Sequence, residues 1–172
     1  MWRMIVVMMS LVPLAPAIAG NVTKELNSYN GLSVSISETA AKCNLTDSAV
    51  FSDYLRGKLH ELGLKDNPNS EVHVAVGISG TTFGLLGANC VMHTQVSFNV
   101  LLRAENIVTD NQTAREAIDR LGEFPIRLWS HSAFGVKPLS QPAAGGKSLA
   151  AYDAVKSHID LIVARFKKSQ SE

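Results

Sequence analysis

The sequence predicts an α+β fold, a two-layer sandwich in which two main helices cover one face of a roughly four-stranded, mostly antiparallel sheet. Two observations predict it. Several segments alternate between apolar and polar residues, as strands with one buried and one solvated face do, and two others repeat apolar residues at helical spacing. The predicted order is strand, helix, two strands, a short helix, a strand and a final helix. Because each strand keeps one polar face, both main helices should cover the same side of the sheet.

The four predicted strands cover residues 31–37, 71–78, 90–102 and 123–134. Pro125 suggests that the last of them lies at an edge of the sheet or begins there. If the first strand and the second pair in parallel, the helix between them should form a right-handed crossover. The side chains predicted to face the helices include Leu32, Val34, Ile36, Val72, Val74, Val76, Val96, Phe98, Ile126 and Leu128.

The two main helices are predicted to follow Thr46 and Ser148. Thr46 and Asp47 are suitable caps for the first helix, and Gly63 is well placed to end it. Ser148 is a suitable cap for the second. A short helix is predicted within residues 114–121, before the last strand.

The first twenty residues have the pattern of an export signal. Arg3 is followed by an apolar run over residues 4–12, which is too short to span a bilayer, and then by Ala17-Ile18-Ala19. We expect cleavage near Ala19, a periplasmic or secreted location, and no transmembrane segment in the mature chain. The predicted organisation is a signal peptide (1–19), a flexible lead-in (20–30), a single α+β domain (31–167) and a frayed tail (168–172).

Charge argues against some classes of partner. Without Arg3, the mature chain has 15 basic and 15 acidic residues, interspersed along the sequence. This balance gives no electrostatic reason to expect binding to nucleic acid or to an anionic membrane.

The chain has two cysteines, Cys43 and Cys90. In an exported protein a disulfide between them is the first expectation. A reactive thiol is the alternative, but neither cysteine belongs to a CxxC pair or follows an obvious activating base.

The polar face of the predicted sheet is the first candidate binding surface. Strand alternation places on it His73, His93, Arg127, Trp129 and His131, together with Ser33, Ser35, Gln95, Ser97 and Asn99. Arg127 beside Trp129 would hold a planar or anionic ligand by hydrogen bonding and stacking. The three histidines would suit zinc or copper as a weaker alternative. The simplest interpretation is a solvated sheet face with no ligand.

The glycine-rich segment between the second and third strands is the second candidate. It carries Phe83, Leu85 and Leu86. These side chains would contact a partner or a membrane surface, or would fold back to extend the core near Cys90, which is the version we slightly favour.

The sequence contains no HExxH, GxSxG, CxxC or phosphate-binding loop pattern, and no cofactor is expected. We therefore expect a small exported, non-enzymatic binding or assembly module whose partner is another envelope or extracellular protein. One alternative is a metal- or ligand-dependent enzyme that uses His73, His93 and His131. The other is a structural homodimer formed through an edge strand or the glycine-rich tip.

Overall fold

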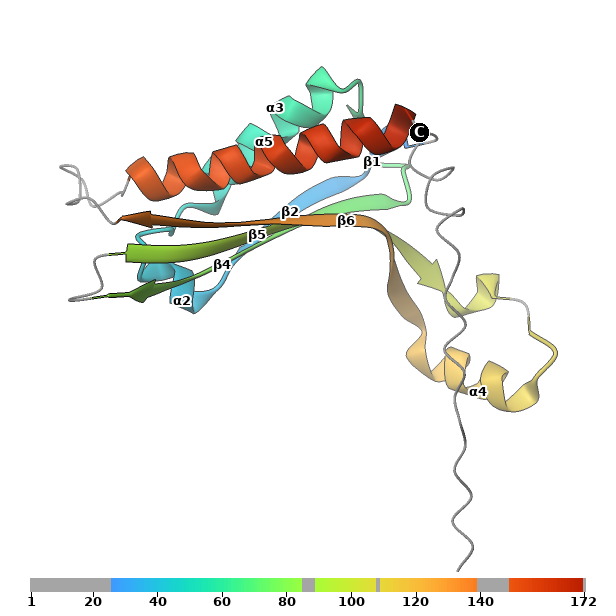
Figure 1. Ribbon diagram of the computed structural model, residues 1–172. Helices are drawn as coiled ribbons and strands as arrows, with labels where there is room; N and C mark the ends of the chain where they lie inside the picture. The colour runs from blue at the N-terminus through green and yellow to red at the C-terminus, as the bar shows by residue number, and fades with distance from the viewer. Residues whose placement is uncertain (1–25, 85–88, 108, 139–148, 172) are drawn as a thin grey trace, which may run out of the picture.

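A computed structural model describes residues 26–84, 89–107, 109–138 and 149–171 (Figure 1). The predicted signal peptide, its cleavage site, Leu85 and Leu86 lie outside these residues. Within them, no helix is both long enough and apolar enough to cross a membrane.

The main sheet has four strands in the order β2–β4–β5–β6. β2 (Gly31–Ile36) and β4 (Val72–Phe83) are parallel, whereas β5 (Asn89–Arg103) and β6 (Glu123–Pro138) are each antiparallel to their predecessor. The predicted α+β class and its mostly antiparallel four-stranded sheet are confirmed. The structure adds a small parallel sheet of β1 (Ser28–Tyr29) and β3 (Lys65–Asp66).

Helices α3 (Ser48–Glu61) and α5 (Leu149–Ser171) cover the same face of the sheet, as predicted (Figure 1). The short α2 (Glu38–Ala41) packs near β4. No described element covers the other face, and we call it the open face.

Helix α3 begins and ends at residues near those predicted. Asp47 is its N-cap, but the Asp47 side chain makes no capping hydrogen bond. Instead, the backbone N–H groups of Thr46 and Asp47 donate to the hydroxyl of Tyr152 in α5, at 3.3 and 3.0 Å. Gly63, with φ at +86°, follows the last turn and supplies the left-handed conformation that favours glycine.

The core lies between the two helices and the sheet. Phe51, Leu55 and Leu59 of α3 and Ile159, Ile162 and Phe166 of α5 are buried against Val74, Val76, Ile78, Val96 and Phe98 of the sheet. Leu26 and Tyr29 are also buried. The prediction of a loosely packed lead-in is therefore wrong at these two residues, because β1 joins β3 beside the core.

Cys43 and Cys90 form the predicted disulfide, with their Cα atoms 5.8 Å apart. The bond joins the segment after α2 to the second residue of β5. A Cβ atom at Gly80 of β4 would lie 3.2 Å from the Cys43 sulfur, so the absence of a side chain there leaves room for the bridge. A buried disulfide indicates a location outside the reducing cytoplasm.

The far ends of β5 and β6 leave the sandwich as an arm (Figure 1). The arm also contains a 3₁₀ turn, η2 (Ala104–Asn106), and α4 (Gln112–Leu121), which is the predicted short helix. The β5–β6 register shifts between Phe98 and Asn99, so Leu128 of β6 is an extra, unpaired residue. Such a bulge bends a strand and increases its twist.

Candidate functional site

The candidate site is the open face, to which all four strands contribute. Strand pairing and alternation give its members, because residues that pair across strands point to the same face. Over the sandwich they are Ser33 and Ser35; His73, Ala75, Gly77, Ser79, Thr81 and Phe83; Asn89, Val91, His93, Gln95, Ser97 and Asn99; and Ser130, Ser132, Phe134 and Val136. Arg127, which pairs with Asn99, continues the same face where β6 enters the arm.

Alternation predicted the open face correctly for the first three strands. His73, His93, Gln95, Ser97 and Asn99 lie on it, as do both serines of β2. These assignments hold because Val74, Val76, Val96 and Phe98 are buried on the helix side.

For β6 the predicted face is wrong at Trp129 and His131. Trp129 pairs with Phe98 and His131 pairs with Val96, so both lie on the helix side. The bulge at Leu128 is the physical reason, since one extra residue reverses the face of every residue after it. Leu128 and Trp129 both pack against the core, whereas Ile126, also predicted to face the helices, is exposed.

Trp129 belongs to an aromatic cluster and not to an open binding surface. Its ring meets that of Phe166 edge to face at 5.1 Å and that of Phe98 at 5.8 Å. Arg127 pairs with Asn99 before the bulge, on the opposite side of the strand from Trp129. The structure therefore does not form the predicted site in which Arg127 and Trp129 hold one ligand.

The three histidines do not form a metal site. His131 lies on the helix side, while His73 and His93 lie on the open face at different ends of the ladder, opposite Asn99 and Ser79. Among the described residues, no group of three His, Cys, Asp or Glu side chains is arranged to hold a metal. The metal-enzyme alternative based on these histidines is therefore wrong.

Two adjoining hollows lie on the open face and share Ser79 and His93. The first is the more polar of the two, with Ser35, Gln95 and the bare backbone of Gly77 among its lining. The second is more apolar and includes Val91 and Phe134. His93 lines both hollows and therefore lies between the more polar and the more apolar parts of the face.

The apolar end of the open face was missed by the sequence analysis. Phe134 is 67% exposed and Val136 is 50% exposed. The predicted strand stopped at residue 134, although Ser132, Phe134 and Val136 continue the alternation. Following that pattern further would have placed both side chains on one face.

Hydroxyl groups on the open face bond mainly to the sheet itself. The Ser33 hydroxyl and His73 Nε2 are 2.9 Å apart, and the Ser35 hydroxyl donates to the Val76 carbonyl at 3.2 Å. Asn99 donates to the Ser97 hydroxyl at 3.1 Å. These bonds hold the polar side chains in place without a ligand.

Phe83, in the second candidate region, is 44% exposed at the end of β4. It is not part of the buried core, so the expectation that it folds back is wrong for this residue. Leu85 and Leu86 lie outside the described residues.

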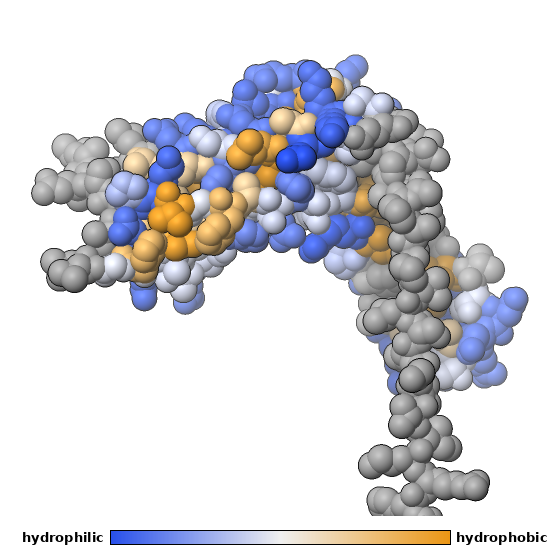
Figure 2. Space-filling model, in the orientation of Figure 1, coloured by the Kyte–Doolittle hydropathy of each residue, from blue (hydrophilic) through white to orange (hydrophobic). Residues whose placement is uncertain are grey.

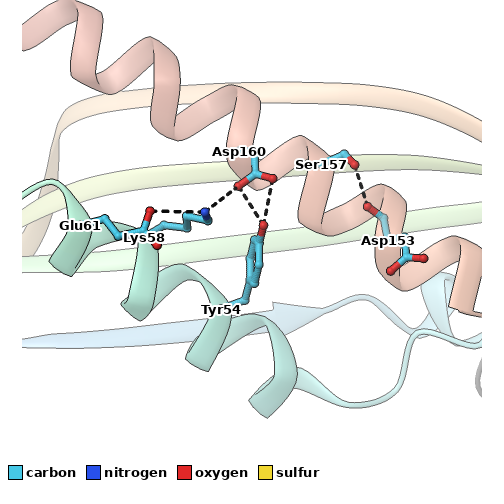
Figure 3. A network of polar contacts seen from close by, with 6 residues as sticks. All are labelled: Tyr54, Lys58, Glu61, Asp153, Ser157 and Asp160. Atoms are coloured by element: carbon cyan, nitrogen blue, oxygen red, sulfur yellow. Dashed lines mark hydrogen bonds and ion pairs between the residues drawn. The ribbon is translucent and has the colours of Figure 1, made fainter.

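Two polar clusters lie away from the open face. Figure 3 shows one between the main helices, where the Tyr54 hydroxyl donates to both carboxylate oxygens of Asp160 at 2.9 Å and Lys58 donates to Glu61 at 3.3 Å. Partial desolvation and the Asp160 carboxylate raise the pKa of Tyr54. This cluster ties α3 to α5, which is a structural role.

The other cluster lies where α3 meets the small sheet. His60 Nε2 lies 3.1 Å from an Asp66 oxygen and 3.5 Å from the Tyr29 hydroxyl. Both contacts use the same ring nitrogen, so the histidine cannot pass a proton from one partner to the other through its ring. Burial and the Asp66 carboxylate raise the pKa of Tyr29. This geometry anchors β1 and β3 to the helix.

No protein-family model and no curated protein matches this chain. Among solved structures, rare lipoprotein B from Shewanella oneidensis is similar at 15% identity and a TM-score of 0.38, covering 83% of this chain and 94% of that one. A minor lipoprotein from Acinetobacter baumannii has 11% identity and a TM-score of 0.37, with 83% and 91% covered. A hypothetical protein from Chlamydia trachomatis has 13% identity and a TM-score of 0.45, with 84% and 97% covered. The chain thus bears a distant structural resemblance to two bacterial lipoproteins.

Proposed function

We propose that this chain is an exported, non-enzymatic binding or assembly module that holds another envelope or extracellular protein on its open face. One observation carries the proposal. Over the sandwich, none of the open-face residues named above is Asp, Glu, Lys or Arg, although no described element covers this face; the charged members, Arg127, Arg103 and Glu123, begin only where β5 and β6 enter the arm. Depletion of charged residues is typical of the centre of a protein interface.

The arrangement of the face supports a protein as the partner. Small side chains are frequent in the middle of the face, and the exposed Phe134 and Val136 lie together at one end. Aromatic side chains with a polar surround often supply much of the binding energy at such surfaces. Internal hydrogen bonds already order Ser33, Ser35 and Asn99, so binding would cost little additional side-chain entropy.

The export part of the proposal depends on two features. The sequence begins with the pattern of a signal peptide, and the buried Cys43–Cys90 bond suits an oxidising compartment. We expect the partner to be in the same compartment.

Photo-crosslinking in cells tests the proposed surface. A photoreactive residue at Ser33, exposed on the open face at the sheet edge opposite β6, should give a specific crosslinked protein. The same residue at Ala164, exposed on α5, is the matched control and should not. Equal crosslinking from both surfaces, or none from the open face, would contradict the proposal.

Charge insertion gives an independent test. The Ser35→Lys/Gln95→Lys double variant places two charges on the face without filling the core, and it should abolish the crosslink made from Ser33. Ala164→Lys adds a charge on the helix side and should leave the crosslink unchanged. Circular dichroism checks that each variant is folded, and an undiminished crosslink in the folded double variant would exclude this face as the binding surface.

A further inference from the structure

We propose that two copies of this chain associate through the outer edge of β6, in an antiparallel arrangement about a two-fold axis, and so form one continuous eight-stranded sheet. The contact uses the edge of the sheet and the flank of α5, whereas the proposed function uses the open face. Phe134 belongs to both surfaces, and each proposal is therefore tested at residues that the other does not use.

The first observation is an edge strand with a segment in which nothing blocks pairing with a further strand. Within the described residues β6 pairs only with β5, so alternate residues of β6 direct their N–H and C=O groups away from the sheet. Natural edge strands usually carry a charged residue, a proline or a bulge that blocks further pairing. Residues 129–136 contain no Asp, Glu, Lys, Arg or Pro, whereas the bulge at Leu128 precedes them and Lys137 and Pro138 follow.

The second observation is that this segment is complementary to itself. In a symmetric antiparallel pair, a two-fold axis through a residue keeps opposed side chains on the same face of the joined sheet. An axis through Ser132 places a large side chain opposite a small one at each step. The opposed pairs are His131 with Ala133, Ser130 with Phe134 and Trp129 with Gly135 of the second copy.

The third observation is an exposed leucine near the proposed two-fold axis through Ser132. Leu161 of α5 is 61% exposed. Leu161 comes three residues after His158 and therefore lies on the same flank of α5. On this flank the His158 ring lies against Gly135 of β6. Asp160, which contacts Tyr54 of α3, lies on a different flank. Figure 2 shows apolar residues gathered on the side of the molecule where α5 and β6 lie.

The position of Leu161 along α5 matches the position of the axis along β6. The helix runs antiparallel to the strand (Figure 1), with His158 over Gly135 and Phe166 beside Trp129. Leu161 lies between those two helix residues, and Ser132 lies between the two strand residues. The axis through Ser132 therefore brings the two Leu161 side chains toward each other and removes them from water.

A cysteine crosslink tests the register. Both native cysteines are bonded to each other, so an introduced cysteine is the only free thiol. In Ser132→Cys the two thiols face each other at the axis, at a Cα separation that suits a disulfide, and oxidation should give a covalent dimer. In Ser130→Cys, on the same strand and face, each thiol lies opposite Phe134, and oxidation should give little dimer.

Sedimentation equilibrium of the mature, disulfide-bonded protein tests the association itself. The wild-type chain should dimerise, and Leu161→Lys should raise the dimer dissociation constant by at least about tenfold, since the two leucines meet at the axis. Leu101→Lys is the matched control, because Leu101 is 50% exposed in the arm. It should leave the dissociation constant unchanged.

Three outcomes would overturn the proposal: a wild-type monomer over the whole concentration series, equal crosslinking of Ser130→Cys and Ser132→Cys, or equal effects of the two leucine substitutions. A wild-type monomer that instead binds a strand of a different protein at this edge would also exclude a second copy as the occupant. None of these outcomes changes the crosslinking expected from Ser33 on the open face.

Discussion

The hydroxyl of Tyr152 in α5 holds the backbone that leads into α3. It accepts from the N–H groups of Thr46, the residue before the N-cap, and of Asp47, the N-cap itself. A capping side chain would accept from the second or third helical residue, and the Asp47 side chain makes no such bond. One hydroxyl thus links the two helices that cover the sheet.

We expect Tyr152→Phe to lower the free energy of unfolding by about 1 kcal/mol, as the loss of a hydrogen-bonded hydroxyl does. The ring stacked on Phe51 at 5.0 Å is kept in this variant, so packing is unchanged. Urea denaturation measures the effect. Tyr54→Phe removes a hydroxyl whose bond to Asp160 is exposed, and it should cost less than about 0.5 kcal/mol; a larger loss there would show that the surface network is the stronger link.

His158 is a buried polar residue held between two strands and its own helix. Its Nδ1 lies 3.1 Å from the Thr94 hydroxyl, and its ring occupies the space left by the missing side chain of Gly135. Burial lowers the pKa of His158, and the nearby positive charges of His93 and Lys137 lower it further.

This lowered pKa predicts a stability that depends on pH. Protonation is easier in the unfolded chain, so the contribution of neutral His158 is fully present above its unfolded pKa of about 6.5 and is lost as pH falls toward the lower, folded pKa. Urea midpoints measured from pH 7.5 to 5 should therefore decrease. The decrease of the urea midpoint should be smaller in His158→Gln than in the wild type. The control His131→Gln, at an exposed position, should show the same decrease as the wild type. Equal dependence of the midpoint on pH in all three proteins would refute the role of His158.

At the scale of elements, the disulfide fastens the segment after α2 to the start of β5. The two cysteines are 47 residues apart, so the bond restricts a large part of the unfolded chain. Both cysteines are fully buried beside β4, where Gly80 leaves room for them.

Replacing both cysteines by alanine should lower the free energy of unfolding by about 2–4 kcal/mol, because the unfolded chain regains the entropy of a large loop. Guanidinium denaturation of the double variant against the oxidised wild type measures this loss. Reduced wild-type protein should lose a similar amount, and a reduced protein of undiminished stability would show that the bridge restricts little.

The bulge in β6 determines which side chains of this strand belong to the open face. Before Leu128, Arg127 lies opposite Asn99, and after it, Trp129 lies opposite Phe98. Alternation alone cannot reveal an extra residue, because a bulge leaves no fixed signature in the apolar pattern of one strand. For this reason the open face was predictable on β2, β4 and β5 but not on β6, where Phe134 and Val136 replace Trp129 and His131.

At the scale of the whole molecule, the arm is separable from the sandwich. Among the described residues of the arm between Arg103 and Glu123, none belongs to the buried core. The arm is held by its own contacts, including Arg103 with Glu123 at 3.2 Å and Arg115 with Asp119 at 3.1 Å.

Replacing residues 104–122 by Asn-Gly should leave the sandwich folded, with a free energy of unfolding within about 1 kcal/mol of the wild type. Arg103 and Glu123 are paired across β5 and β6, so a two-residue turn can join them, and shortening a loop changes closure entropy only slightly. Thermal unfolding followed by circular dichroism measures the result. Loss of a cooperative transition would mean that the arm is required for folding.

The sequence by itself determined the order of strands and helices, the helix-covered face of the first three strands and the pairing of Cys43 with Cys90. These follow from local periodicity and from having only two cysteines. The tertiary structure decided the rest: the bulge at Leu128, the hydroxyl that Tyr152 supplies to the backbone before α3 from more than a hundred residues away, and the small sheet that buries Tyr29. Each of these depends on which distant segments meet, and a single strand or helix pattern carries no information about that.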